Sequence, residues 1–265
     1  MCSSSGWGVP PPRLQHAAAV VNAGAFGHFG VGVTALDYGE TEVRTVDNPE
    51  GTGEFWDALD LAVGVTYARA LTDRFSFGAT MKFVRQQIWN ESATGGALDL
   101  GVTYDTGWQG VRIGMTMANF GTNMRMDGRD LRLAVDPDEE IEGNNDRIGG
   151  RYETEDWAMP LIFRVGVSAV PFRMGESRLA LAVDGNAPAD AAQSANVGAE
   201  YAWNETLFVR GGWRQAFGPE TDDGWTAGFG VRYGLTSRIV TTFDYVFQNY
   251  EPFGTPQMFT LGVTF

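Results

Sequence analysis

The side chains that most often perform catalysis are scarce in this chain. It contains two histidines, His16 and His28, and one cysteine, Cys2. A hydrolase that used serine and histidine would need both side chains within hydrogen-bonding reach. His28 opens an expected strand directly after a turn, and no serine or asparagine stands beside it in a recognisable motif. One cysteine makes neither a disulfide framework nor a metal site. We therefore expect a protein that is not an enzyme and that holds no cofactor.

The densest group of possible metal ligands is the acidic run DPDEEIEGNND at residues 136–146. Carboxylate oxygens suit Ca²⁺, and the candidate ligands are Asp136, Asp138, Glu140 and Glu142. The run lacks the glycine and the terminal glutamate of an EF-hand loop. A solvated acidic loop is therefore the alternative interpretation.

Composition excludes some partners. The 265 residues carry a formal net charge of −14, which argues against nucleic acid because phosphates require a basic surface. The 35 glycines and the many aromatic residues suit short strands rather than helices. No stretch reaches the roughly 18 apolar residues of a membrane helix. Residues 1–15 show no charged segment followed by an apolar one, so no signal peptide is expected in them.

Apolar and small residues alternate along thirteen segments, and strict period two predicts strands. In the last segment, QMFTLGVTF, every second residue is large and apolar up to the final phenylalanine. The expected strands are 16–23, 28–39, 59–67, 75–83, 98–104, 111–118, 161–168, 178–184, 196–203, 207–214, 225–233, 239–247 and 257–265.

The two faces of these strands differ in an unusual way. The apolar face is almost free of charge, whereas the other face carries glycine, alanine, serine, threonine and a few charges. In a soluble sandwich the polar face would be rich in lysine and glutamate, and buried charges would need partners or water. The pattern therefore indicates apolar side chains toward lipid and a narrow lumen inside a membrane barrel. The expected lumen-facing charges are Asp60, Lys82, Asp99, Arg112, Arg164, Asp184, Glu200, Arg210, Arg232 and Asp244. They are either selectivity groups of an open pore or mutually paired charges that fill it.

The connections alternate between tight turns and longer loops. The turns lie near 24–27, 71–74, 106–110, 171–176, 204–205 and 235–237, and the loops at 40–56, 91–96, 121–159, 186–193, 217–223 and 251–256. Short periplasmic turns and long outer loops are the layout of outer-membrane barrels, which usually have an even number of strands. We therefore expect one barrel domain at residues 16–265 after an irregular segment 1–15. Thirteen strands of a likely fourteen indicate a chain truncated at its N-terminus.

The C-terminal strand resembles the assembly signal of outer-membrane proteins. The expected signal residues are Phe259, Leu261, Val263 and Phe265, and the expected partners are outer-membrane lipid and the barrel assembly machinery. The terminal aromatic would complete the sheet in an interfacial girdle of the bacterial outer membrane.

Several segments resemble the PorV/PorQ family, whose barrels are similar to the FadL fatty-acid transporter. The similar stretches are 60–131, 160–170 and 178–214, for example DLAVGVTYARALTDRFSFGATMKF and NVGAEYAWNETLFVRGGWR. The resemblance implies a barrel that supports type IX protein secretion or surface attachment, with secreted cargo proteins and other secretion components as partners. Members begin with a signal peptide and an N-terminal plug, which this sequence lacks, as expected of a truncated chain.

Two other functions remain open. A FadL-like transporter of hydrophobic small molecules would have an apolar pocket inside the barrel. A passive porin would conduct ions.

Overall fold

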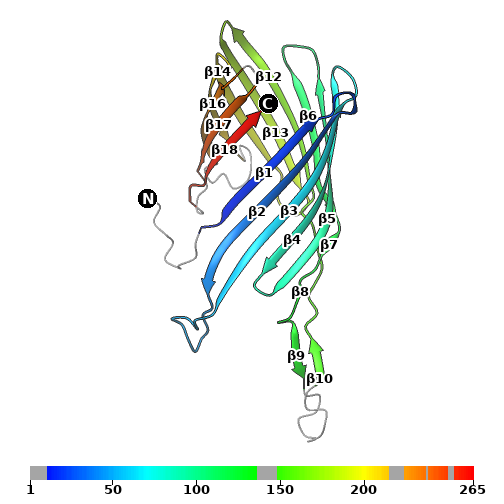
Figure 1. The fold of residues 1–265 in the computed structure, drawn as a ribbon, viewed down its shortest axis with the longest axis vertical. Coiled ribbons are helices and arrows are strands. Elements are labelled where there is room, and N and C mark those ends of the chain that lie inside the picture. The colour runs from blue at the N-terminus through cyan, green and yellow to red at the C-terminus, as the bar shows by residue number, and fades with distance from the viewer. Residues whose placement is uncertain (1–10, 136–147, 215–223, 237, 250–253) are drawn as a thin grey trace, which may run out of the picture. The chain divides into compact units, whose positions relative to one another are not determined.

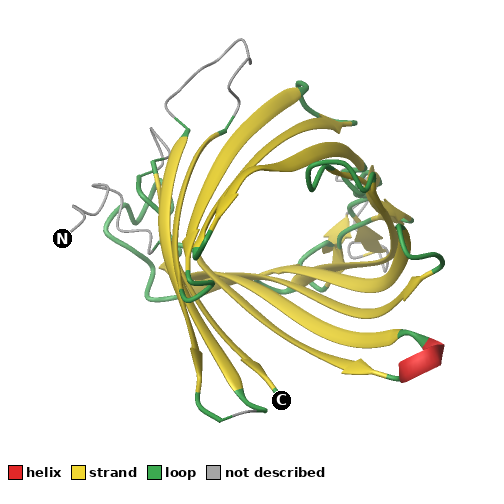
Figure 2. Ribbon diagram, turned by 90° about the horizontal axis from the view of Figure 1, so that it is seen from above, coloured by secondary structure: helices red, strands yellow, loops and turns green. Residues whose placement is uncertain are grey.

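The computed structural model describes residues 11–135, 148–214, 224–236, 238–249 and 254–265. These residues form strands, turns and one short 3-10 helix, η1 (Gly24–Phe26), drawn in red in Figure 2. Within the described ranges, no helix is long and apolar enough to cross a membrane.

Thirteen strands follow one another in a single antiparallel sheet, and they correspond one for one to the thirteen predicted segments. Their bounds are β1 (Arg13–Asn22), β2 (His28–Glu42), β3 (Phe55–Ala70), β4 (Phe75–Ile88), β5 (Glu91–Asp105), β6 (Arg112–Gly121), β12 (Ile162–Met174), β13 (Ser177–Pro188), β14 (Ser194–Trp203), β15 (Leu207–Trp213), β16 (Trp225–Gly234), β17 (Val240–Gln248) and β18 (Gln257–Thr264). The sheet order is β1-β2-β3-β4-β5-β6-β12-β13-β14-β15-β16-β17-β18.

Five shorter strands lie between β6 and β12. They are β7 (Asn123–Met124), β8 (Asp127–Gly128), β9 (Arg132–Val135), β10 (Ile148–Arg151) and β11 (Trp157–Ala158). β8 pairs with β5 and is the fourteenth strand of the large sheet, while β9 pairs with β10 and β7 with β11. The predicted additional N-terminal strand stays a prediction.

The chain divides into two compact units. The first comprises Met1–Ala68, Ala79–Asp99 and Asn119–Met159, and the second Arg69–Gly78, Leu100–Ala118 and Pro160–Phe265. In the first unit, β1, β2 and β3 run side by side (Figure 1, blue to cyan). In the second, β12 to β18 follow one another as antiparallel neighbours, from green to red.

A small apolar cluster lies in the first unit. Ala93 and Ala97 of β5 pack with Met124 of β7 and with Met159, and all four are buried. β7 and β11 pair at Met124 and Trp157, which fixes Met124 over β5. Apart from this cluster, the described residues include only two buried hydrophobic side chains, Ala202 and Phe208.

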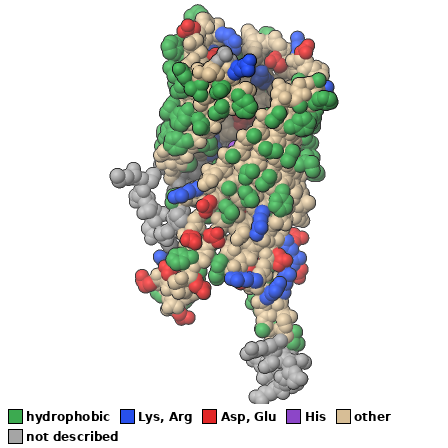
Figure 3. Space-filling model, in the orientation of Figure 1, with side chains coloured by type: hydrophobic (Ala, Val, Ile, Leu, Met, Phe, Trp, Pro, Cys, Tyr) green, Lys and Arg blue, Asp and Glu red, His purple; other side chains and the backbone are tan. Residues whose placement is uncertain are grey.

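The apolar face of the strands is uncovered. Val65 of β3 is 59% exposed and Leu261 of β18 is 73% exposed, although both lie in the middle of their strands. In Figure 3 hydrophobic side chains lie over the strands, and acidic ones gather at the loop that joins β2 to β3. A soluble protein rarely exposes so much contiguous apolar surface. This exposure is what a lipid-facing sheet requires, and it excludes a second sheet packed on this face among the described residues.

Several loop predictions need correction, and the predicted loop 40–56 is shortened to residues 43–54. Residues 91–96 were expected to form a long loop, but β5 begins at Glu91, and β4 and β5 are joined by a two-residue turn at Trp89 and Asn90. The expected loop 121–159 contains β7 to β11, and the connection after β13 is shortened to residues 189–193. The physical reason is that strands continue past the apolar span wherever backbone partners are available. The loop predicted at 217–223 lies outside the described residues.

Candidate functional site

The small face of the second unit carries an open hollow of about 570 Å³. The hollow is lined mainly by alternate residues of β13 to β16, the positions that sequence alternation assigns to the small face. Its floor is a belt of small residues, which pair across the sheet in the order Ala182, Gly198, Gly212 and Thr226. We call these four residues the small-residue belt. Because glycine and alanine project so little, the belt leaves the space that larger side chains would fill.

The two glycines of the belt, Gly198 and Gly212, differ in how closely other atoms surround them. A Cβ atom built on Gly212 would lie 3.0 Å from the Val197 carbonyl oxygen and 3.1 Å from Thr226 Oγ1. A Cβ atom on Gly198 would meet nothing nearer than 3.8 Å. A side chain can therefore be introduced at Gly198 without a backbone clash, and it would project into the hollow.

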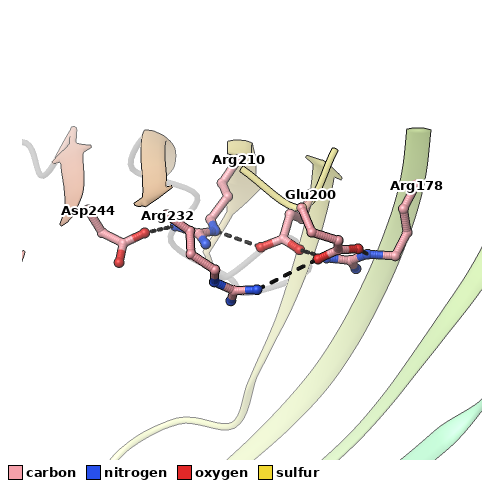
Figure 4. A network of polar contacts seen from close by, with 6 residues as sticks. Arg178, Glu200, Arg210, Arg232 and Asp244 are labelled. Carbon is pink, nitrogen blue, oxygen red and sulfur yellow. Dashed lines mark hydrogen bonds and ion pairs between the residues drawn. The ribbon is translucent and has the colours of Figure 1, made fainter. Parts of the chain in front are cut away.

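Charged side chains fill one end of this face, toward the turn that joins β14 to β15 at residues 204–206. We call this the short-turn end, and we call the six residues the charge ladder: Arg178, Glu200, Glu205, Arg210, Arg232 and Asp244 (Figure 4). The ladder contains three arginines and three carboxylates.

Glu200 of β14 is the centre of the ladder. Arg178 of β13 donates from Nη2 to Glu200 Oε1 at 2.8 Å, and Arg210 of β15 donates from Nε to Glu200 Oε2 at 2.7 Å. Arg210 also donates from Nη1 to Asp244 of β17. These are charge-assisted hydrogen bonds, which are stronger than neutral ones. The side chains of Arg178 and Glu200 are only 17% and 26% exposed.

Two glycines let the ladder cross β16. This strand lies between β15 and β17, so the Arg210 side chain must pass over it to reach Asp244. Gly228 pairs with Arg210 and Gly230 with Asp244 in the strand register. A Cβ atom on Gly230 would collide with Asp244 Oδ1 and would lie 3.0 Å from Arg210 Nη1. The ion pair therefore depends on the absence of a side chain at Gly230.

An aromatic ring lies within the ladder. Phe208 of β15 is only 5% exposed, and the guanidinium carbons of Arg210 and Arg232 lie 5.3 and 5.1 Å from its ring centroid. Both distances fall within the range of cation–π contacts. Phe208 was not among the predicted site residues. The signal was present, because Phe208 alternates with Leu207 and Val209 and so occupies a small-face position as a bulky aromatic.

The turn residue Glu205 also belongs to the ladder, and neither it nor Arg178 was among the ten predicted small-face charges. Arg178 donates from Nε to Glu205 Oε1 at 2.8 Å, and Arg232 lies 3.9 Å from Glu205 Oε2. The hydrogen bond from Arg178 lowers the pKa of the Glu205 carboxyl below its ordinary value. The turn is thereby tied to β13 and β16.

A second polar group lies on the same face, on the other side of the small-residue belt. A recess of about 250 Å³ is lined by Arg164, Asp184, Asn186, Ser194, Asn196 and Arg214. Asn196 donates to Asp184 Oδ2 at 2.9 Å. The hollow of the second unit thus has a small-residue middle and two polar ends.

The first unit has its own hollow of about 350 Å³ on the small face of β1 to β4. It is lined in part by His16, Gly64 and Lys82, and His16 Nδ1 lies 2.9 Å from Thr34 Oγ1. Lys82 pairs with Asp99 at 2.8 Å and donates to Asn119 Oδ1 at 2.5 Å.

Most of the ten predicted small-face charges have a polar partner. The ion pairs are Lys82 with Asp99, Glu200 with Arg210, Arg210 with Asp244, Arg232 with Glu205 at 3.9 Å, and Arg112 with Asp105 at 3.7 Å. Asp184 accepts a hydrogen bond from Asn196, and Asp60 accepts one from Tyr38. Arg164 lines the recess of the second unit. The geometry thus favours mutually paired charges over free selectivity groups.

The remaining predicted sites are placed as follows. Asp136, Asp138, Glu140 and Glu142, the Ca²⁺ candidates, lie outside the described residues. Among the described residues, no group of three or more histidine, cysteine or acidic side chains could hold a metal ion. Phe259, Leu261, Val263 and Phe265 are all well exposed on the apolar face, and their role as an assembly signal stays a prediction.

Comparison with known proteins supports the fold. No protein-family model and no curated protein matches the sequence. Among solved structures, the chain is similar to the toluene transporter TodX of Pseudomonas putida, with a TM-score of 0.54 and 12% identity over 95% of this chain and 85% of that one. It is also similar to the monoaromatic hydrocarbon channel CymD, with a TM-score of 0.52 and 12% identity over 96% and 84%. The chain therefore has the fold of these transport proteins, an antiparallel β-barrel of the outer-membrane type. The predicted barrel fold is supported, and the resemblance to the PorV/PorQ family stays a prediction.

Proposed function

We propose that the protein carries hydrophobic small molecules across a bacterial outer membrane. The observation that carries this proposal is the hollow of the second unit, which has a small-residue belt in its middle and charges restricted to its two ends. The fold shared with two hydrocarbon transport proteins supports the same function. Transport of hydrophobic small molecules is the alternative that the sequence left open beside a role in secretion.

The dimensions of the hollow suit a small ligand. Its volume of about 570 Å³ lies within the usual range of small-molecule sites, roughly 300–1,000 Å³. Such sites are mostly apolar with a few placed polar groups. Because Glu200, Arg210 and Asp244 are paired with one another, an uncharged ligand at the belt would not have to displace water from isolated charges.

The test is uptake of radiolabelled toluene by Gram-negative cells that carry the chain in their outer membrane. Gly198→Leu should reduce uptake, because its side chain would fill the hollow beside Gly212. Gly185→Leu is the matched control. Gly185 lies on the opposite face of β13, where a Cβ atom would meet nothing within 4 Å, so uptake should be unchanged. Uptake no higher than in cells without the protein, or equal loss in both variants, would refute the proposal.

Support for type IX secretion is the second candidate function. One observation favours it: the β9–β10 hairpin extends beyond β8 in the first unit (Figure 1) and is tied to it by an ion pair between Arg151 and Asp127. An ordered projection of this kind can contact a protein partner.

The two functions predict different deletion results. Replacing residues 132–151 by a short Gly-Ser turn leaves Met124 and Met159, and therefore the apolar cluster, intact. A secretion role predicts that cargo no longer reaches the cell surface while toluene uptake is kept. Cargo that still reaches the surface would exclude recognition through this hairpin.

A further inference from the structure

The polar recess on the far side of the small-residue belt differs from the charge ladder in its balance of charge. All six side chains that line it are polar or charged: Arg164, Asp184, Asn186, Ser194, Asn196 and Arg214. Two arginines therefore stand against one carboxylate, whereas the ladder holds three of each. In a chain whose formal net charge is −14, the recess is a local excess of positive charge.

The strand register places these side chains at two successive levels of one wall. At the first level, Arg164 of β12 pairs with Asn186 of β13, and Asn186 pairs with Ser194 of β14. Asn186 Nδ2 lies 3.5 Å from Ser194 Oγ. At the next level, two residues nearer the belt, Asp184 pairs with Asn196. The recess is therefore formed by neighbouring strands of the second unit alone.

Arg164 is the group of the recess whose bonding capacity is unused. Among the residues that the structure describes, its guanidinium has no hydrogen-bond or ion-pair partner, whereas Arg178 and Arg210 of the ladder each bind two carboxylates. The carboxylate of the recess, Asp184, accepts a hydrogen bond from Asn196 instead. A guanidinium presents five N–H donors in a planar fork that matches the oxygens of an anion. Arg164 is exposed, so an anion can reach these donors.

The lining also indicates the class of anion. A site without apolar side chains suits a ligand that is polar throughout, rather than a hydrocarbon that carries a carboxylate. One guanidinium can bind both oxygens of a carboxylate, whereas a phosphate has further oxygens that require donors. Arg214, the Ser194 hydroxyl and the Asn186 amide supply such donors on neighbouring strands. A phosphate therefore uses more of the recess than a carboxylate does.

We propose that this recess binds a phosphate group, with Arg164 as the principal donor. The group is either free inorganic phosphate or the phosphate of an ester. The inference goes beyond transport of hydrophobic molecules and does not rest on it, because no residue of the small-residue belt lines the recess. Since Arg164 attracts an anion and Asp184 repels it, replacing these two residues should change the affinity in opposite directions.

The test is isothermal titration calorimetry of the purified full chain in an uncharged detergent, with sodium phosphate at pH 7 and low ionic strength. The unaltered chain should bind one phosphate. Arg164→Gln should weaken binding about tenfold, because it removes both the charge and the fork of donors. Asp184→Asn should tighten binding about fivefold, because it removes the negative charge of the recess, while its amide oxygen can still accept from Asn196. The matched control is Arg112→Gln, which removes an exposed arginine of the same face outside the recess and should leave the affinity unchanged.

Several outcomes would overturn the proposal. They are absence of phosphate binding by the unaltered chain, equal losses in Arg164→Gln and Arg112→Gln, and displacement of phosphate by acetate at equal concentration. Weaker binding by Asp184→Asn, in a variant shown to be folded by its heat-modifiable mobility on a gel, would overturn it as well, and this variant keeps the proposal testable if Arg164→Gln does not fold. Glucose 6-phosphate separates the two sources of the group. Binding tighter than that of inorganic phosphate supports an ester, and equal or weaker binding supports free phosphate.

Discussion

Replacing Gly230 by alanine should break the ladder without changing any charged residue. The new methyl group would occupy the position through which Arg210 reaches Asp244. The variant therefore separates the geometry of the ladder from its charges. Gly234→Ala is the matched control, because Gly234 lies on the same strand and face, and its Cβ atom would lie 3.8 Å from the nearest atom.

The expected effect follows from two opposing terms. A hydrogen bond to a charged group contributes about 1.5–3 kcal/mol when buried. The side chains of Arg210 and Asp244 are 36% and 28% exposed, so solvent screening reduces this to about 1–2 kcal/mol. Replacing glycine by alanine in an unstrained conformation returns about 0.5 kcal/mol through the unfolded state. Gly230→Ala should therefore lower the free energy of unfolding by about 1 kcal/mol, whereas Gly234→Ala should leave it unchanged or raise it by about 0.5 kcal/mol.

The assay is urea unfolding of the protein from lipid vesicles, followed by tryptophan fluorescence. A double-mutant cycle with Asp244→Ala completes it, because removing the carboxylate removes the collision. In that background Gly230→Ala should cost no more than Gly234→Ala. Equal stability of the two glycine variants would refute the reasoning, and so would a cost of Gly230→Ala that persists without Asp244.

Three further predictions concern other positions. The hydrogen bond from Arg178 lowers the pKa of Glu205 below its ordinary 4.5. The stabilisation from this bond is therefore complete above about pH 4.5 and is lost as the pH falls through the lower folded-state pKa. Glu205→Gln should lower the free energy of unfolding at neutral pH and flatten its fall below pH 4.5. Asn119 has φ of +64°, so Asn119→Val should cost about 1–2 kcal/mol more than Asn119→Gly in urea unfolding, and equal costs would exclude backbone strain. Met124 is buried, so Met124→Ala should cost about 2–5 kcal/mol locally and speed protease cleavage within residues 148–156; an unchanged cleavage rate would show that the apolar cluster does not hold this segment.

The thirteen long strands could be predicted because one physical constraint acts on all of them. Where one face meets lipid and the other does not, every second residue must be apolar, and the pattern survives in strands as different as β3 and β18. The same reasoning failed at 91–96. Around Gln86, Gln87, Asn90 and Glu91 both faces carry polar residues, so hydrophobic alternation disappears although the strands continue.

The members of the ladder were only partly predictable. Glu200, Arg210, Arg232 and Asp244 follow from alternation, because a charge on the small face stands out. Their pairing does not follow, since it depends on the strand register and on which side chain can cross a neighbouring strand. Glu205 lies in a turn, where alternation carries no information.

The glycines and the charges of the small face are parts of one arrangement. Gly230 gives Arg210 room to reach Asp244. In the first unit, a Cβ atom on Gly64 would lie 3.1 Å from Thr80 Cγ2 and 3.5 Å from the Lys82 stem. A long charged side chain beside glycine can lie flat along the wall and find a partner there, whereas beside a larger residue it would project away from the sheet. A face rich in glycines and charges therefore need not be an ion pathway. The glycines leave room for the charged side chains to reach one another, and the paired charges neutralise one another.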